Sequence, residues 1–209
     1  MDRVKRYHKA LAAADLVIRD NPEDPAAHHN KGVVLEKLGR FNEALDSFHQ
    51  AIKYKPNFAR AYYNIGRTLR SMGKYKEAIN AFDKAAEIKP NIPIIYNQRS
   101  AALIDLGASL KPEYSRSLFE AAIRDAEKTI ELSSASEGFY NLACANAHLK
   151  NYEDALEALG KCKIAKGVEF DALHAWEDTD FNELRKPPYL KNFERIVGPK
   201  PSSAHKDIW

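Results

Sequence analysis

The sequence is short of the features that mark membrane-spanning, signal-bearing or unspecific nucleic-acid-binding chains. Its 209 residues contain no run of about 18 apolar residues, so no membrane-spanning helix is expected. Residues 1–20 mix charges with apolar residues at helical spacing and lack the unbroken apolar core of a signal peptide. The net charge of +3 is small for this length, which disfavours unspecific binding to nucleic acid.

Cysteine is also scarce. The two cysteines, Cys144 and Cys162, are too few for a disulfide framework. Cys162 falls where a small core residue is expected, and Cys144 falls on the inner side of a helix. We expect both thiols to be reduced and unreactive, and we take the cytoplasm as the simplest location.

No pattern in the sequence indicates catalysis. There is no Gly-rich phosphate loop, and no Ser or Cys has a recognisable catalytic partner. Asp171, His174 and Asp178 are spaced to share one face of a helix, where they could hold a metal ion. The stretch is richly acidic, however, so a solvated face is the better interpretation. We predict that the chain is not an enzyme and needs neither cofactor nor metal.

The strongest signal is a repeat with a period of 34 residues, which many independent columns share. The columns are Gly32, Gly66 and Ser100; Leu35, Leu69 and Leu103; Gly39, Gly73 and Gly107; Tyr7, Phe41 and Tyr75; Ala10, Ala44 and Ala78; and Pro22, Pro56 and Pro90.

Each column has a physical reason. The small residues of the first column let two helices approach closely, and the leucines fill the space between them. The glycines of the third column are expected just past a helix end, in a left-handed backbone that lacks a Cβ clash only for glycine. Proline followed by asparagine, at Pro56 and Pro90, ends the second helix and begins a turn. The unit is therefore helix, tight turn, helix, turn.

Two strings carry this pattern almost completely: HHNKGVVLEKLGRFNEALDSFHQAIKYKPN and YYNIGRTLRSMGKYKEAINAFDKAAEIKPN. With an aromatic, Leu-Gly, a second aromatic, Ala, Phe, Ala and Pro at fixed places, the chain resembles the tetratricopeptide-repeat (TPR) family. The departures are His28 and Tyr62, where Trp is commonest, and Lys31 at an apolar place. The resemblance implies an all-α fold, a TPR-type superhelix (solenoid) of antiparallel helix pairs.

The third repeat carries an insertion. Four residues separate Gly39 from Ala44, whereas fourteen separate Gly107 from Ala122, so ten residues have been added. We interpret the insertion (108–117) as a longer loop between helices plus an early start of the second helix, with Pro112 near its first turn. The predicted parts are a half repeat or cap helix at 1–24, a TPR array at 25–169 (25–58, 59–92, 93–135 with the insertion, 136–169), capping helices at 170–197 and a flexible tail at 198–209.

Both ends depart from the repeat. Residues 1–24 match only a second helix, which would leave an apolar strip for a second copy, a partner or more of a longer chain to cover. A shortened repeat and a natural cap stay open as explanations. Near the other end, Asp178–Phe181, Leu184-Arg185 and Pro188-Tyr189 resemble a structural helical ending found after TPR arrays. Trp209, the last residue, is either exposed without a structural contact or a residue that binds a partner.

The resemblance also implies a concave groove lined by the first helix of each repeat. The side chains expected there offer guanidinium forks for carboxylates, amides for a peptide backbone and flat tyrosine rings. We predict binding of an extended or helical peptide with some acidic character. The alternative is that Asn64 and Asn30 only bridge helices and that the arginines form a solvated face. The predicted groove residues are Arg60, Tyr63, Asn64, Arg67, Arg70, Asn97, Gln98, Tyr140 and Asn141.

One TPR specificity can be tested on the sequence, namely the carboxylate clamp for the acidic tail of heat-shock chaperones. It needs Lys and Asn from one repeat, Asn from the next, and Lys and Arg from the third. The matching positions are His29, Val33, Asn64, Ile94 and Gln98, or, one repeat later, Tyr63, Arg67, Gln98, Glu137 and Asn141. Only Asn64 fits, so we predict a different partner.

Three functions are compatible with the sequence. The first is a non-catalytic scaffold that binds another protein. The second is a self-assembling structural module that uses the N-terminal half repeat. The third is a helical-repeat RNA binder, which the small net charge disfavours. It would use Arg60, Arg67, Arg70, Lys74 and Lys76.

Overall fold

The structure is a computed structural model that describes residues 3–133, 136–165 and 172–200. The chain divides into two compact units, one ending at Ala102 and the other beginning at Leu103. All regular secondary structure in the described residues is helical. None of the described helices is both long and apolar enough to cross a membrane. The predictions for Trp209 and for the tail beyond residue 200 lie outside the described residues.

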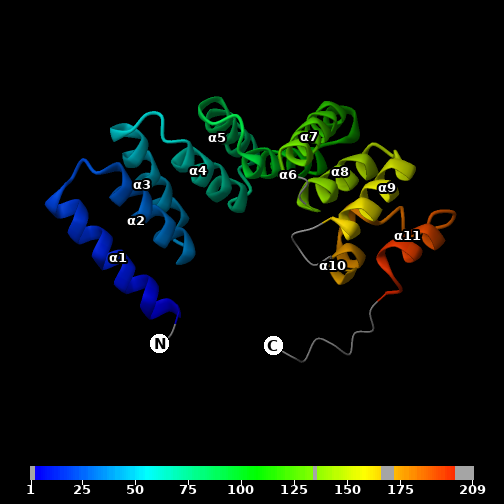
Figure 1. Cartoon of the computed structure of the whole chain (residues 1–209), viewed down its shortest axis with the longest axis horizontal. Coiled ribbons are helices and arrows are strands. Elements are labelled where there is room, and N and C mark those ends of the chain that lie inside the picture. Colours follow the sequence, from blue (N-terminus) through cyan, green and yellow to red (C-terminus); the bar gives the residue numbers. More distant parts are fainter. Residues whose placement is uncertain (1–2, 134–135, 166–171, 201–209) are drawn as a thin grey trace. The chain divides into compact units, whose positions relative to one another are not determined.

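The N-terminal unit is a series of antiparallel helix pairs (Figure 1). Helix α1 packs on α2, α2 on α3, α3 on α4 and α4 on α5, in sequence order. The helices are α1 (Arg3–Asp20), α2 (Pro25–Lys37), α3 (Phe41–Tyr54), α4 (Ala59–Ser71), α5 (Tyr75–Ile88) and the first part of α6 (Pro93–Ala108). The predicted all-α fold of paired helices is confirmed.

Each pair is held together by a phenylalanine that packs against a glycine. Phe48 and Phe82 are completely buried. A Cβ added to Gly32 would lie 2.5 Å from a ring carbon of Phe48, and one added to Gly66 would lie 2.7 Å from Phe82. Because any larger residue would push the ring away, glycine is what allows the two helices of a pair to approach so closely.

The turn between the helices of a pair depends on a second glycine. Gly39 has φ of +74° and Gly73 has φ of +73°, the left-handed backbone that glycine adopts without strain. The Gly39 amide donates to the Glu36 carbonyl and the Arg40 amide donates to the Leu35 carbonyl, each at 2.9 Å, which satisfies two carbonyls at the end of α2. This part of the repeat prediction is confirmed.

The same prediction is wrong for Gly107, and the insertion lengthens the helices rather than the loop. Gly107 lies inside α6, and its Cβ position is 2.7 Å from a ring carbon of Phe119, so it serves close packing. The α6–α7 connection, 109–111, is as short as 38–40, whereas α6 and α7 (Pro112–Ser133) have 16 and 22 residues against 13 and 14 in α4 and α5. Pro112 begins α7, as expected.

The C-terminal unit continues with further helices. Helix α7 packs on α8, α8 on α9 and α9 on α11. Phe181, Leu184 and Phe193 are completely buried and form the core of its last part. The elements are α8 (Ser136–His148), α9 (Tyr152–Ile164), α10 (Ala172–Glu177), the 3₁₀ turn η1 (Thr179–Phe181) and α11 (Leu190–Val197).

Arginine and aspartate side chains fix this C-terminal segment. Arg185 donates to the carbonyl oxygens of Trp176, Asp178 and Phe181. Asp178 caps η1 by accepting from the Asp180 amide at 2.9 Å. The motif that resembles a TPR ending therefore fixes the turn between α10 and α11, and its residues have a structural explanation.

Candidate protein-binding groove

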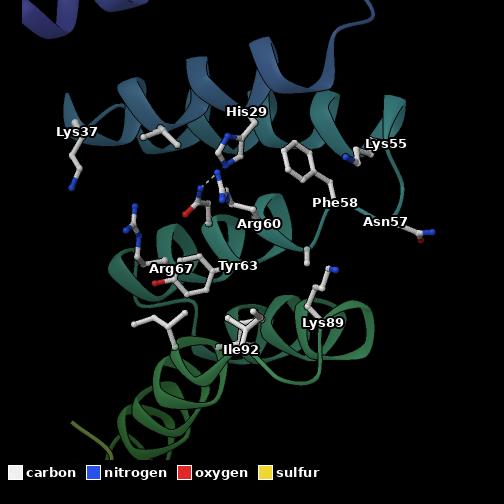
Figure 2. A pocket seen from close by; sticks show the side chains of 15 residues that line it. His29, Lys37, Lys55, Asn57, Phe58, Arg60, Tyr63, Arg67, Lys89 and Ile92 are labelled. Carbon is white, nitrogen blue, oxygen red and sulfur yellow. Dashed lines mark hydrogen bonds between the residues drawn. The ribbon is translucent and has the colours of Figure 1, made fainter. Parts of the chain in front are cut away.

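A groove of about 760 Å³ lies on the N-terminal unit, along the face formed by the first helix of each pair (Figure 2). Helices α2, α4 and the start of α6 supply its walls, and the loops before α4 and α6 close one end. This volume is in the range of sites that bury most of the surface of a drug-sized ligand. The lining residues are His29, Val33, Lys37, Lys55, Asn57, Phe58, Ala59, Arg60, Tyr63, Asn64, Arg67, Lys89, Ile92, Ile94 and Ile95.

The charged side chains that line the groove all carry the same sign. Figure 2 shows Lys37 and Arg67 at one end, Lys55 and Lys89 at the other, and Arg60 between them. None of the lining residues is an aspartate or a glutamate. A concave surface with cations and no lining carboxylate concentrates positive potential, which attracts an acidic ligand.

Arg67 is already engaged within the chain. Its guanidinium lies 2.5 Å from the carboxylate of Glu36 on α2, and it also lies over the ring of Tyr63, 5.9 Å from the ring centroid. Burial raises the pKa of the Tyr63 phenol, so this ring stays neutral. The three side chains tie α4 to α2, and Arg67 therefore has a structural duty besides any contact with a ligand.

Asn64 and His29 form a second bridge between α4 and α2. The Asn64 amide nitrogen lies 2.8 Å from His29 Nε2, and both side chains are buried. Burial lowers the pKa of His29, which favours a neutral ring whose Nε2 accepts this hydrogen bond. The His29 ring also packs against Phe48 and Phe58. Asn64 thus has the helix-bridging role that the sequence left open as the alternative.

Arg60 differs from Arg67 in being available. It is exposed and forms no ion pair with any residue that the structure describes. Its charge acts on the buried His29 ring, because it contributes to the lowered pKa of that group. An exposed guanidinium in the middle of the groove is well placed for a fork-shaped contact with a carboxylate.

The remaining predicted groove residues lie elsewhere. Arg70 and Gln98 are half-buried and Asn97 is buried, and the groove lining includes none of the three. Tyr140 and Asn141 belong to the C-terminal unit. The Tyr140 hydroxyl donates to Asp178 at 2.7 Å, and its ring stacks on His174 and meets the edge of Phe181. Burial raises the pKa of this phenol. The chain itself therefore covers part of Tyr140.

Sequence reasoning overlooked the loop side of the groove. Lys55 and Phe58 precede α4, and Lys89 and Ile92 precede α6. The signal was present, because Lys55 and Lys89, and likewise Phe58 and Ile92, stand 34 residues apart and so occupy equal places in their repeats. These places follow the end of the second helix, whereas the predicted groove residues all lie on first helices.

The acidic residues near the C-terminus have structural partners. Cys144, Asp178 and Asp180 have ligand atoms within 4.8 Å of one another. Asp178 accepts from Tyr140 and from the Asp180 amide, and Asp180 lies 2.8 Å from His148 Nε2. These bonds explain the cluster as a clasp between α8 and η1. Of the metal site considered in the sequence, Asp171 lies outside the described residues.

Comparison with known proteins identifies the repeat. The family described as Tetratricopeptide repeat matches residues 25–58 and 59–92, which contain α2–α3 and α4–α5. Residues 25–92 are therefore two tetratricopeptide repeats, as the sequence pattern predicted. No curated protein sequence matches the chain significantly.

Solved structures with a similar fold include several of the protein MamA. The structure named "Crystal structure of MamA protein" has a TM-score of 0.67 and 18% identity, and covers 77% of this chain and 82% of its own. "MamA 41-end from Desulfovibrio magneticus RS-1" has a TM-score of 0.66 and 20% identity, with 78% and 95% covered. "MamA RS-1 ArsTM double mutant" has a TM-score of 0.66 and 21% identity, and the match covers 76% of this chain and 84% of that chain. At this identity the likeness concerns the fold.

Proposed function

We propose that this chain is a non-catalytic scaffold that holds an acidic segment of another protein in the groove of its N-terminal unit. The observation that carries the proposal is the groove lining, which contains five cationic side chains and no carboxylate. TPR proteins are generally binding modules. The polar side chains with partners, such as Asn64, Arg67 and Asp178, bridge helices or cap them. The buried free thiols of Cys144 and Cys162 suit a reducing compartment, and the cytoplasm is our expected location.

The partner is not expected to be a heat-shock-chaperone tail. His29, Val33 and Ile94 line the groove at places where the carboxylate clamp requires charged or amide side chains. His29 is neutral and bonded to Asn64, and the other two are aliphatic. Recognition would instead combine Arg60 and the peripheral lysines with apolar contacts.

Reversal of the Arg60 charge tests the proposal. Arg60 is exposed and unpaired, so Arg60→Glu should leave thermal stability unchanged and weaken binding of a partner segment by about tenfold or more. The partner is first identified from a pull-down with the purified chain, and its peptide is then titrated by calorimetry. Arg124→Glu, an exposed arginine on α7, is the matched control and should bind normally.

Equal affinity of the Arg60→Glu and Arg124→Glu variants for that peptide would contradict the proposal. Arg67→Glu is a poorer test of the groove than Arg60→Glu. The new carboxylate would face Glu36, which is mostly buried, and a loss of binding could not be separated from a loss of folding.

Self-association is the second candidate, and α1 favours it. Val4, Leu16 and Val17 are 50%, 51% and 46% exposed, whereas Ala51, in the same repeat column as Val17, is 0% exposed. A second copy could cover this face, with the basic first half of one α1 against Asp15 and Asp20 of the other. Light scattering over a concentration range tests it, and a constant monomeric mass would remove it.

A further inference from the structure

The groove carries an apolar surface next to its charges, and the acidic-peptide proposal does not account for it. Ile92 and Ile94 are large aliphatic residues that remain 40% and 46% exposed although they line a concave site. Half-buried Phe58 lines the same groove from the preceding loop. Exposed aliphatic side chains in a hollow gain stability when an apolar group covers them.

Two of the five cations, Lys55 and Lys89, lie at the loop end of the groove, where Phe58 and Ile92 also lie. Figure 2 shows Lys55 beside Phe58, and Lys89 beside Ile92, with Arg60 toward the middle of the groove. The Lys55 ammonium lies 5.0 Å from the centre of the Phe58 ring. Because both repeats place a lysine and an apolar residue at equal positions, the loop end of the same groove carries two such pairs.

We propose, on the basis of the proposed function, that the partner segment carries a large apolar residue flanked by carboxylates. The apolar side chain covers Phe58, Ile92 and Ile94, and the carboxylates face Arg60, Lys55 and Lys89. Charge complementarity selects acidic chains, and the apolar anchor selects one residue within them. A peptide with only one of the two features meets only part of the surface.

A protein segment fits this surface better than single-stranded RNA does. RNA also carries negative charge, but its bases bind by stacking on aromatic planes. The exposed apolar side chains of the groove are isoleucines. The Phe58 ring is half-buried and contacts His29 and Lys55, and the Tyr63 ring contacts Arg67 and Phe82. Aliphatic side chains match a leucine, isoleucine or phenylalanine of a partner instead.

A random-sequence peptide library, selected on the purified full chain, tests the inference directly. Peptides that also bind the doubly reversed variant Arg60→Glu/Lys89→Glu are discarded. The surviving peptides should share an aliphatic or aromatic residue next to aspartate or glutamate. A selected peptide is then remade with its apolar residue changed to serine, and separately with its carboxylates changed to amides. Each change should weaken binding by roughly tenfold, because each removes one of the two kinds of contact.

The apolar wall is tested from the protein side with Ile94→Ser. This residue is already half exposed, so the change should preserve folding and weaken the selected peptide about fivefold, from the apolar area lost. Ile164→Ser, at an isoleucine of α9 that is 83% exposed, is the matched control and should bind with unchanged affinity.

The outcomes separate this inference from the proposed function. Selected peptides that are acidic, depend on Arg60 and keep their affinity after the serine change would overturn the inference alone. A selection without any peptide that depends on Arg60 would overturn both. A single-stranded RNA oligonucleotide is tested in the same way. RNA binding that Arg60→Glu abolishes and that the selected peptide does not displace would also count against a protein segment.

Discussion

Gly107 offers a sharp test of how the long third hairpin is built. The structure places it inside α6, with the ring of Phe119 2.7 Å from the position of an added Cβ. Gly107→Ala should gain about 1 kcal/mol of helix propensity, but lose about 1–3 kcal/mol because the ring must move. The expected net effect is a destabilisation of up to about 2 kcal/mol.

Removing the ring should reverse this sign. In a Phe119→Leu background the Cβ has room, so Gly107→Ala should stabilise the chain by up to about 1 kcal/mol. Gly160→Ala on α9, where nothing lies within 4 Å of the added Cβ, is the control and should be stabilising by a similar amount. Urea denaturation followed by far-UV circular dichroism measures all four variants.

The competing explanation predicts a different cycle. If Gly107 ended a helix with a left-handed backbone, as the sequence suggested, alanine would be strained at any size of residue 119. The interhelical contact would be refuted if Gly107→Ala lowered the stability of the chain equally with phenylalanine and with leucine at position 119.

Two further perturbations follow from the site and the C-terminal clasp. Burial lowers the pKa of His29 in the folded chain, so the unfolded chain binds more protons as the pH falls. The free energy of unfolding should therefore be highest above about pH 6.5 and decline below it. The decline should be smaller in His29→Gln, as measured by chemical denaturation across this pH range. Tyr140→Phe removes the hydrogen bond to the Asp178 carboxylate and should cost about 1.5–3 kcal/mol in thermal unfolding; an unchanged midpoint would contradict the clasp.

The sequence predicted the N-terminal unit well because its repeat is physically redundant. A glycine that admits a phenylalanine ring, a glycine at a left-handed turn and a proline after the second helix recur at one spacing. Residues 25–58 and 59–92 therefore specify both the helices and their packing. The prediction failed at Gly107 because glycine serves two purposes in the repeat, and the sequence does not say which one a lengthened hairpin uses.

The candidate site was predicted in part for a related reason. Arg60, Tyr63, Asn64 and Arg67 line the groove because their positions follow from the helix period. Whether each is available depends on partners that are distant in sequence, such as Glu36 for Arg67. Tyr140 is partly covered by a segment outside the repeat, and the repeat period contains no information about such a segment.

The third hairpin also has a bearing on how such arrays change length. Seven residues, about two helical turns, separate Ser100 from Gly107 and also Phe119 from Ala126. Each pair of residues therefore lies on one face of its helix, the face that packs against the other helix of the hairpin. A hairpin lengthened in whole turns keeps its neighbours in register. If residues 108–117 were removed as a block, Gly107 would stand where Gly39 and Gly73 stand, ready to end a helix of ordinary length.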